Sequence, residues 1–337
     1  MRKLIFAGLG VLVLAFAVRG LLENTPERVL PEGVAFYQTD LDFYALEWHQ
    51  EAGQTEKTLF AGGRNGLYRF DGQAFTFVKA FPGTDVRALY CDESLLYIGS
   101  EQGLYRYDGR QFDLLLPQRI ECLAMSGDGL WAGTLTGAYR IGDGFRISEA
   151  DGLLSDYVYT MLVLPDGAIL FGGYEAKGGI TLYRDGNFAA FAVSDGLPHP
   201  YVTSFLEIDG LVWAGTGFFD RGGACRLVIK DSEMVLDAVL SKEDGLAGEK
   251  VRGLYRDRNG YIWFASEADG IAIFDGGERI RLLTANDYLP HDEVLCFLED
   301  VDNGLFRGLW MGTPSGAVYL DETACLRPAA NKQPPKN

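Results

Sequence analysis

The sequence is poor in the residues that build metal and disulfide sites. Among 337 residues there are three histidines and five cysteines, and no two cysteines form a CxxC pair. Their spacing predicts no disulfide framework, and their odd number leaves at least one thiol unpaired within the chain. We therefore expect neither a zinc site nor a disulfide scaffold, and no motif indicates a cofactor.

Basic residues are also scarce. Lys and Arg total 30 against 47 Asp and Glu, so the formal net charge is -17. A surface of this sign repels phosphate backbones and anionic lipid headgroups over a Debye length. The composition therefore argues against nucleic acid as a partner.

One apolar run stands at the N-terminus, over residues 4–18, after two basic residues. It is shorter than the roughly 20 residues of a spanning helix and is typical of a secretory signal. A cleaved signal peptide and a retained anchor both remain open. We assign 1–21 to this segment and 22–33 to a linker, and expect contact with the membrane only through this segment.

Glycine and aromatic residues are abundant, with 43 glycines and an aromatic share of 13%. This composition favours short strands joined by tight turns. One element recurs seven times as an aromatic residue, usually with glycine two places later, followed by a short loop, another glycine and an apolar strand. Its copies begin at Phe60, Tyr97, Trp131, Phe171, Trp213, Trp263 and Trp310.

A second pattern precedes each copy. An apolar residue is followed two places later by a small residue and then by a large apolar one. The apolar residues are Phe43, Val86, Ile120, Val158, Val202, Val251 and Val294. The small residues are Ala45, Ala88, Cys122, Thr160, Ser204, Gly253 and Cys296. A strand next to a crowded axis needs small side chains there, so both cysteines are expected to fill the core.

The units of roughly 35 to 50 residues match the period of a propeller blade. The sequence therefore predicts an all-β fold, a seven-bladed β-propeller of four-stranded antiparallel blades over residues 34–327. Residues 328–337 are expected to form a disordered tail. Two segments, 34–37 and 324–327, are candidates for the strand that closes the ring, and the sequence does not choose between them.

The stretch Leu130–Gly137, with Val212–Thr216 and Leu309–Gly316, resembles the two-component regulator propeller repeat. The companion segment Asp-Gly-Leu stands before the innermost strand at Asp151, Asp195 and Asp244. The resemblance implies the extracytoplasmic sensing propellers of membrane histidine kinases, which are thought to bind glycans or other small ligands. No kinase or immunoglobulin-like domain follows the seventh blade, so a signal would pass to a separate protein.

Two insertions mark the predicted binding site. In a four-stranded blade, the loops between second and third strands share a face with the links between blades, at the mouth of the axial channel. Blades four and five carry longer loops there, with an inter-blade link between them. The predicted ligand-binding residues on these loops and this link are Tyr174, Glu175, Lys177, His199, Tyr201, Phe218, Phe219, Asp220 and Arg221.

The histidines, one acidic turn and the mouth carboxylates are the candidates for metal or catalytic roles. His199 and His291 occupy equivalent places two blades apart, and His49 belongs to the opposite face, so we expect turn residues and no shared metal site. The turn at 300–304 resembles a calcium loop, but a hairpin fits its position better. Mouth carboxylates that could serve a lyase or hydrolase are Asp151, Asp156, Asp220 and Glu249.

These observations favour an exported, non-catalytic propeller that senses or scaffolds at the cell envelope through its mouth-side loops. Its expected partner is a glycan, a peptide or an envelope protein, including a separate membrane signalling protein. A polysaccharide lyase or glycoside hydrolase using mouth carboxylates is the alternative.

Overall fold

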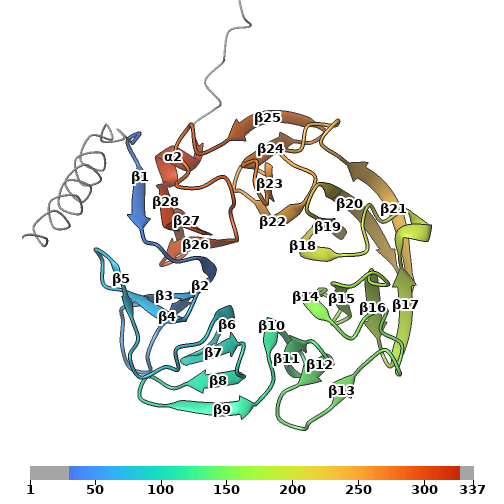
Figure 1. The fold of residues 1–337 in the computed structure, drawn as a ribbon, viewed down its shortest axis with the longest axis horizontal. Helices are drawn as coiled ribbons and strands as arrows, with labels where there is room; N and C mark the ends of the chain where they lie inside the picture. The colour runs from blue at the N-terminus through green and yellow to red at the C-terminus, as the bar shows by residue number, and fades with distance from the viewer. Residues whose placement is uncertain (1–29, 327–337) are drawn as a thin grey trace, which may run out of the picture. The chain divides into compact units, whose positions relative to one another are not determined.

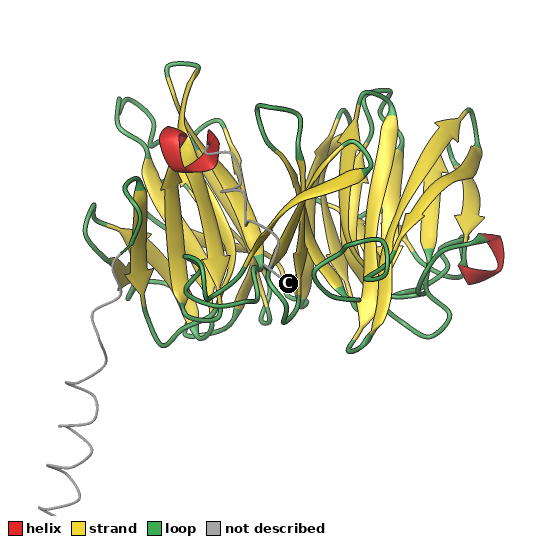
Figure 2. Ribbon diagram, turned by 90° about the horizontal axis from the view of Figure 1, so that it is seen from above, coloured by secondary structure: helices red, strands yellow, loops and turns green. Residues whose placement is uncertain are grey.

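The computed structural model describes residues 30–326, and almost all of its regular structure is β-strand (Figure 1). The strands form seven sheets of four antiparallel strands, arranged around a central axis. Seen from the side, the sheets stand next to one another with their loops on two opposite faces of the ring (Figure 2). The predicted seven-bladed, all-β fold is confirmed.

Blades one to six take their four strands in chain order from the axis outward. The innermost strands are β2 (Phe43–His49), β6 (Val86–Asp92), β10 (Ile120–Ser126), β14 (Val158–Val163), β18 (Val202–Ile208), β22 (Val251–Arg256) and β26 (Cys296–Asp302). The second strands are β3 (Thr58–Gly63), β7 (Leu95–Ser100), β11 (Gly129–Thr134), β15 (Ile169–Gly173), β19 (Leu211–Phe218), β23 (Ile262–Ser266) and β27 (Leu305–Thr313).

The outer half of each blade follows the same order. The third strands are β4 (Gly66–Phe70), β8 (Leu104–Tyr107), β12 (Gly137–Arg140), β16 (Ile180–Arg184), β20 (Arg221–Lys230), β24 (Ile271–Asp275) and β28 (Gly316–Asp321). The outermost strands are β5 (Phe75–Phe77), β9 (Phe112–Leu116), β13 (Arg146–Ile147), β17 (Asn187–Phe191), β21 (Glu233–Leu240), β25 (Glu278–Leu283) and β1 (Val34–Gln38). Within the described part of the chain, the helical segments are η1 (Val193–Asp195) and α2 (Glu322–Leu326).

The hub is as crowded as the sequence predicts. In blades one to six the innermost strand begins with a buried apolar residue, and in blade seven such a residue stands just before β26. All seven are 0–1% exposed: Phe43, Val86, Ile120, Val158, Val202, Val251 and Val294. A β-carbon added to Gly62 in blade one would lie 2.5 Å from Cγ1 of Val86 in blade two. Glycine in the second strand therefore allows the innermost strand of the next blade to approach closely.

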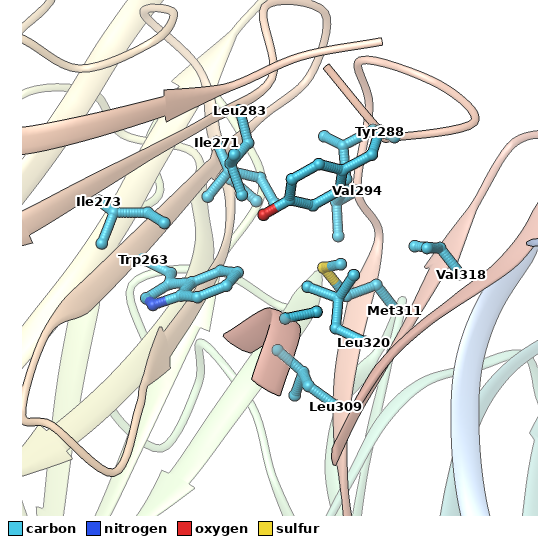
Figure 3. Packing of buried hydrophobic residues seen from close by; sticks show 13 residues of the cluster. Trp263, Ile271, Ile273, Leu283, Tyr288, Val294, Leu309, Met311, Val318 and Leu320 are labelled. Atoms are coloured by element: carbon cyan, nitrogen blue, oxygen red, sulfur yellow. The ribbon is translucent and has the colours of Figure 1, made fainter. Parts of the chain in front are cut away.

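Large apolar side chains fill the wedges between blades. Between blades six and seven, Trp263 packs in one buried cluster with Leu309 and Met311, and Tyr288 and Val294 from the link join it (Figure 3). Trp263 is 1% exposed. Burial of a side chain of this size contributes about 4 kcal/mol to folding. This cluster therefore stabilises the contact between blades six and seven.

The N-terminal strand closes the ring. Strand β1 pairs with β28 in antiparallel register along its whole length, from Val34 to Gln38. The expectation of an outer strand at 324–327 is wrong, because the described part of that segment belongs to helix α2. Asp321 starts this helix, since its Oδ1 accepts a hydrogen bond of 2.8 Å from the backbone N–H of Ala324. The chain thus leaves the sheet and β1 takes the free edge.

The assignments of a signal or anchor to 1–21, most of the linker 22–33 and the tail 328–337 lie outside the described residues. Within residues 30–326, no helix is both long enough and apolar enough to cross a bilayer.

Candidate functional site

The predicted mouth-side face is present in the structure. In a meander of four strands, the loop after the second strand returns to the end at which the first strand began. Backbone hydrogen bonds join these segments directly, from Tyr174 N to Tyr157 O at 3.0 Å in blade four and from Gly217 N to Tyr201 O at 2.9 Å in blade five. Both predicted insertions therefore lie on the face that carries the inter-blade links.

The insertion of blade five is an extension of the sheet rather than an irregular loop. Strands β19 and β20 stay paired out to Phe218 and Arg221, and Phe219 with Asp220 makes the turn. Phe219 has a φ of 52° and is 72% exposed. The left-handed conformation costs a bulky residue about 1–2 kcal/mol. The hairpin thus holds a strained aromatic ring in solvent at its tip.

Five of the predicted residues form one group, which we call the mouth aromatic cluster: Tyr174, His199, Tyr201, Phe218 and Phe219. The ring centroid of Tyr201 lies 4.6 Å from that of Tyr174, 5.0 Å from that of His199 and 5.0 Å from that of Phe218. Phe218 and Phe219 are 4.3 Å apart. Blades four and five and the link between them therefore build a continuous aromatic surface.

The four charged residues predicted beside the aromatics lie around this cluster. Lys177, Asp220 and Arg221 are exposed, and Glu175 is half-buried. Within residues 30–326, none of these side chains forms a hydrogen bond or an ion pair with another residue. Burial first, and then the positive charge of Arg221, lowers the pKa of His199. These four groups are therefore available to hydrogen-bond a bound molecule.

Lys250 supports the cluster and was missed by the sequence reasoning. It is 5% exposed, and its Nζ donates to the Tyr174 hydroxyl at 3.2 Å and to Glu267 at 2.6 Å. The same Nζ lies 5.8 Å from the Tyr174 ring centroid and 5.9 Å from that of Phe218. Lys250 stands directly before its innermost strand, as Tyr201 does, so the repeat alignment contained the signal that could have found it.

A ring of seven residues surrounds the axis on the same face, and we call it the axial ring. Each member directly follows the buried apolar residue at the start of the hub pattern. Blades one to six have a register shift there, which leaves the member out of the ladder. The members are Tyr44, Arg87, Glu121, Tyr159, Thr203, Arg252 and Leu295, and all of them line an axial cavity of about 480 Å³.

On one side of the axial ring, four alternating charges connect blades two and three. The carboxylate of Glu121 is 1% exposed and accepts a 2.5 Å hydrogen bond from Arg119. Arg87 donates to Glu101 at 3.2 Å, and its Nε lies 3.9 Å from Glu121. Burial acts to lower the pKa of Arg87, but the carboxylates of Glu121 and Glu101 outweigh burial, and the pKa is raised. Arg87 therefore keeps its positive charge at the mouth.

On the other side, Arg252 bonds across the mouth. It donates to Glu293 at 3.0 Å and to the Tyr159 hydroxyl at 3.1 Å, although Tyr159 belongs to blade four and Arg252 to blade six. The Tyr159 ring stacks on Tyr174 at 4.6 Å. The axial ring and the mouth aromatic cluster are therefore in contact through these two tyrosines.

His199 and His291 act as turn residues, whereas His49 is the last residue of strand β2. The Nδ1 of His199 accepts from the backbone N–H of Tyr201 at 3.2 Å, and that of His291 accepts from Glu293 at 2.8 Å. His49 is 1% exposed and its Nε2 lies 2.8 Å from a backbone carbonyl. Among the described residues, no group of three or more His, Cys, Asp or Glu is placed to hold a metal ion.

The mouth carboxylates fall into two pairs. Asp151 and Asp156 accept hydrogen bonds from backbone N–H groups of their own turns, at 3.0 Å and 2.8 Å. Asp220 and Glu249 line a second cavity of about 330 Å³ together with Phe219. The first pair therefore has a structural task, and the second pair faces a space beside the hairpin tip.

The 300–304 segment is the predicted hairpin, turning between β26 and β27.

Comparison with solved structures supports the fold at low sequence identity. The extracellular domain of the putative one component system BT4673 from B. thetaiotaomicron is 18% identical, with a TM-score of 0.68 over 86% of this chain and 40% of that one. PorZ, a bacterial surface component of the type-IX secretion system of Porphyromonas gingivalis, is 15% identical, with a TM-score of 0.61 over 84% and 47%. The chain thus spans less than half the length of both proteins.

A third propeller is similar over nearly its whole length. YCF48, in a structure with the D1 peptide, is 14% identical with a TM-score of 0.60, over 88% of this chain and 99% of that one. No curated protein matches the sequence. Residues 245–268, which run from the Asp-Gly-Leu turn to just past the end of β23, match the family described as two component regulator propeller. The protein is a seven-bladed propeller in which one segment, at the start of blade six, matches the two-component regulator propeller repeat.

Proposed function

We propose that the protein is an exported, non-catalytic propeller that binds a glycan, a peptide or an envelope protein on the mouth aromatic cluster. In this role it senses or scaffolds at the cell envelope. A separate membrane signalling protein is one envelope partner that suits a sensing role. The apolar run at residues 4–18, preceded by basic residues, supports export.

The conformation of Phe219 is the single observation that carries this proposal. A phenylalanine with a φ of 52° costs free energy, and 72% exposure returns almost no burial energy for it. An exposed ring at the tip of a rigid hairpin can stack on a sugar face or enter an apolar pocket of a partner. The free charged groups of Asp220 and Arg221 beside it supply hydrogen bonds.

The compared proteins agree with a binding role outside the cytoplasm. The BT4673 propeller belongs to an extracellular domain of a signalling system, and PorZ is a surface component of a secretion system. YCF48 is seen with a bound peptide. These properties belong to those proteins, and they support the present proposal through a shared fold.

The test is to probe glycan and peptide arrays with the purified protein and with Phe219→Asn. Asparagine tolerates the left-handed conformation, so this change should keep or raise the thermal midpoint while removing the aromatic ring. We expect binding to weaken at least about tenfold, which corresponds to about 1.4 kcal/mol.

Phe145→Ala is the matched control, because Phe145 is as exposed as Phe218, at 39%, and lies in blade three. Unchanged binding in Phe219→Asn, or an equal loss in Phe145→Ala, would refute the proposed site. Cell fractionation tests export separately, and recovery of the protein in the cytoplasm would refute that part.

A further inference from the structure

The axial cavity is a second candidate binding site, which adjoins the mouth aromatic cluster and shares Tyr174 with it. It encloses about 480 Å³, and its wall changes character with depth. The axial ring supplies polar groups at the mouth. Further along the same innermost strands, the lining is mostly apolar: Ala45, Leu46, Ala88, Leu89, Cys122, Leu123, Thr160, Met161 and Cys296.

The polar groups at the mouth have hydrogen-bond donors to spare. A guanidinium has five N–H donors. Arg87 donates one hydrogen bond to a protein group, to Glu101 at 3.2 Å, and its Nε has no hydrogen-bond partner. Its other contacts among residues 30–326 are not hydrogen bonds: Glu121 lies 3.9 Å from its Nε, and the Tyr44 ring centroid lies 5.3 Å from its Cζ. Arg87 therefore keeps most of its donors unused although its side chain is three-quarters buried.

Acceptors at the mouth are hidden or occupied. Glu121 is 1% exposed and sits behind the guanidinium groups of Arg87 and Arg119. The hydroxyl of Tyr159 accepts from Arg252, which leaves its own proton to donate. Thr203 donates its hydroxyl proton to the backbone of Val251. What the axial ring offers to a ligand is therefore mainly N–H and O–H donors with positive charge.

We propose that the axial cavity binds a small organic monocarboxylate, with its carboxylate on Arg87 and its apolar body along the deeper wall. The planar fork of arginine matches the two oxygens of a carboxylate, and the bond is charge-assisted. The apolar layer of Leu89, Leu123 and Met161 accommodates a hydrocarbon chain or ring. Tyr174, which also lines the axial cavity, is the member of the mouth aromatic cluster shared with this site; the residues tested by substitution, Arg87 and Phe219, belong to one site each.

A single negative charge fits better than several. The chain carries a formal charge of -17, which opposes the approach of polyanions. Both arginines of the axial ring are already neutralised in part by Glu101, Glu121 and Glu293. A second or third anionic group would enter an apolar layer without a partner, which is costly.

The experiment is titration calorimetry of the full-length protein with hexanoate, using hexanol and hexylamine as probes of the same length. Hexanoate should bind with a dissociation constant of about 1 mM or below. Hexanol, which lacks the charge, and hexylamine, which reverses it, should bind at least about tenfold more weakly.

Arg87→Gln should weaken hexanoate binding at least about tenfold. Arg106→Gln is the matched control, because Arg106 pairs with Asp113 at 2.8 Å on the outer strands of the same blade. If Arg87→Gln fails to fold, Arg87→Lys keeps the charge without the fork and should still weaken binding. Neither Arg87 substitution should affect the binding of ligands that depend on Phe219.

Four results would overturn the inference. The first is no heat with hexanoate or benzoate up to about 10 mM. The second is equal affinity for hexanoate and hexanol, and the third is hexanoate binding that Arg87 substitutions leave unchanged. Loss of hexanoate binding in Phe219→Asn would also overturn it, since that result assigns the carboxylate to the mouth aromatic cluster. The hexanoate test is independent of the array test of the proposed function, because the two tests use different residues and different probes.

Discussion

Replacement of Lys250 by alanine should destabilise the propeller more than removal of a comparable surface lysine. Lys250 is 5% exposed, and its ammonium group bonds both Glu267 and the Tyr174 hydroxyl. It also lies within 6 Å of two aromatic ring centroids, at 5.8 Å and 5.9 Å. Alanine removes all of these interactions at once.

The magnitude follows from the individual contacts. Hydrogen bonds to a charged group contribute about 1.5–3 kcal/mol, and a partly desolvated cation–π contact adds about 1 kcal/mol. Glu267 is 31% exposed and can regain water when its partner is lost, which reduces the cost. We expect a net loss of about 2 kcal/mol in the free energy of unfolding, or about 4 °C in thermal midpoint.

Thermal and urea unfolding of the purified protein measure this loss, with Lys242→Ala as the matched control. Lys242 faces Asp269 at 3.8 Å on the same side of blade six, but it is 53% exposed. Its removal should change stability by less than about 0.5 kcal/mol. Equal stability of the two variants would show that the buried ammonium group does not brace the mouth.

Further predictions concern the closing seam, a buried acid and the thiols. Gly316→Ala should cost more stability in chemical denaturation than Gly304→Ala, because only the first β-carbon would strike a backbone, 2.2 Å from Tyr37 O, although both glycines have positive φ. Burial raises the pKa of Glu47 to about 7, so stability should fall as pH rises from 4.5 to 7, and a flat profile in Glu47→Gln would confirm this group as the cause. Burial also raises the pKa of the Cys225 thiol to about 12, so this thiol should react with a disulfide reagent at pH 8 only after unfolding, and rapid native reaction would contradict its burial.

The blade repeat was predictable because each of its features meets a local steric requirement. Glycine in the second strand, the preceding aromatic and the small residue of the innermost strand each satisfy a steric demand within one blade or between neighbours. The burial of Val86 and the contact that a β-carbon on Gly62 would make show this demand directly. The aromatic insertions at Phe218 and Phe219 were visible as departures from the same repeat.

Other features depend on contacts that local patterns do not encode. The Asp321 cap directs the chain into α2, and this choice left β28 open to a strand from the other end of the chain. The axial ring exists because a register shift at the same position of six innermost strands removes one residue from each ladder. The alignment showed those positions, but not that they face a common axis.

The sequence by itself determined the unit, its number and the face on which its loops lie, because those follow from steric rules repeated along the chain. Only the tertiary structure decided which polar groups meet at the mouth. Arg252 and Tyr159 are 93 residues apart and bond across an intervening blade, and Lys250 reaches Tyr174 in the same way. Such pairs form because ring closure brings distant blades to one axis, and no local spacing specifies them.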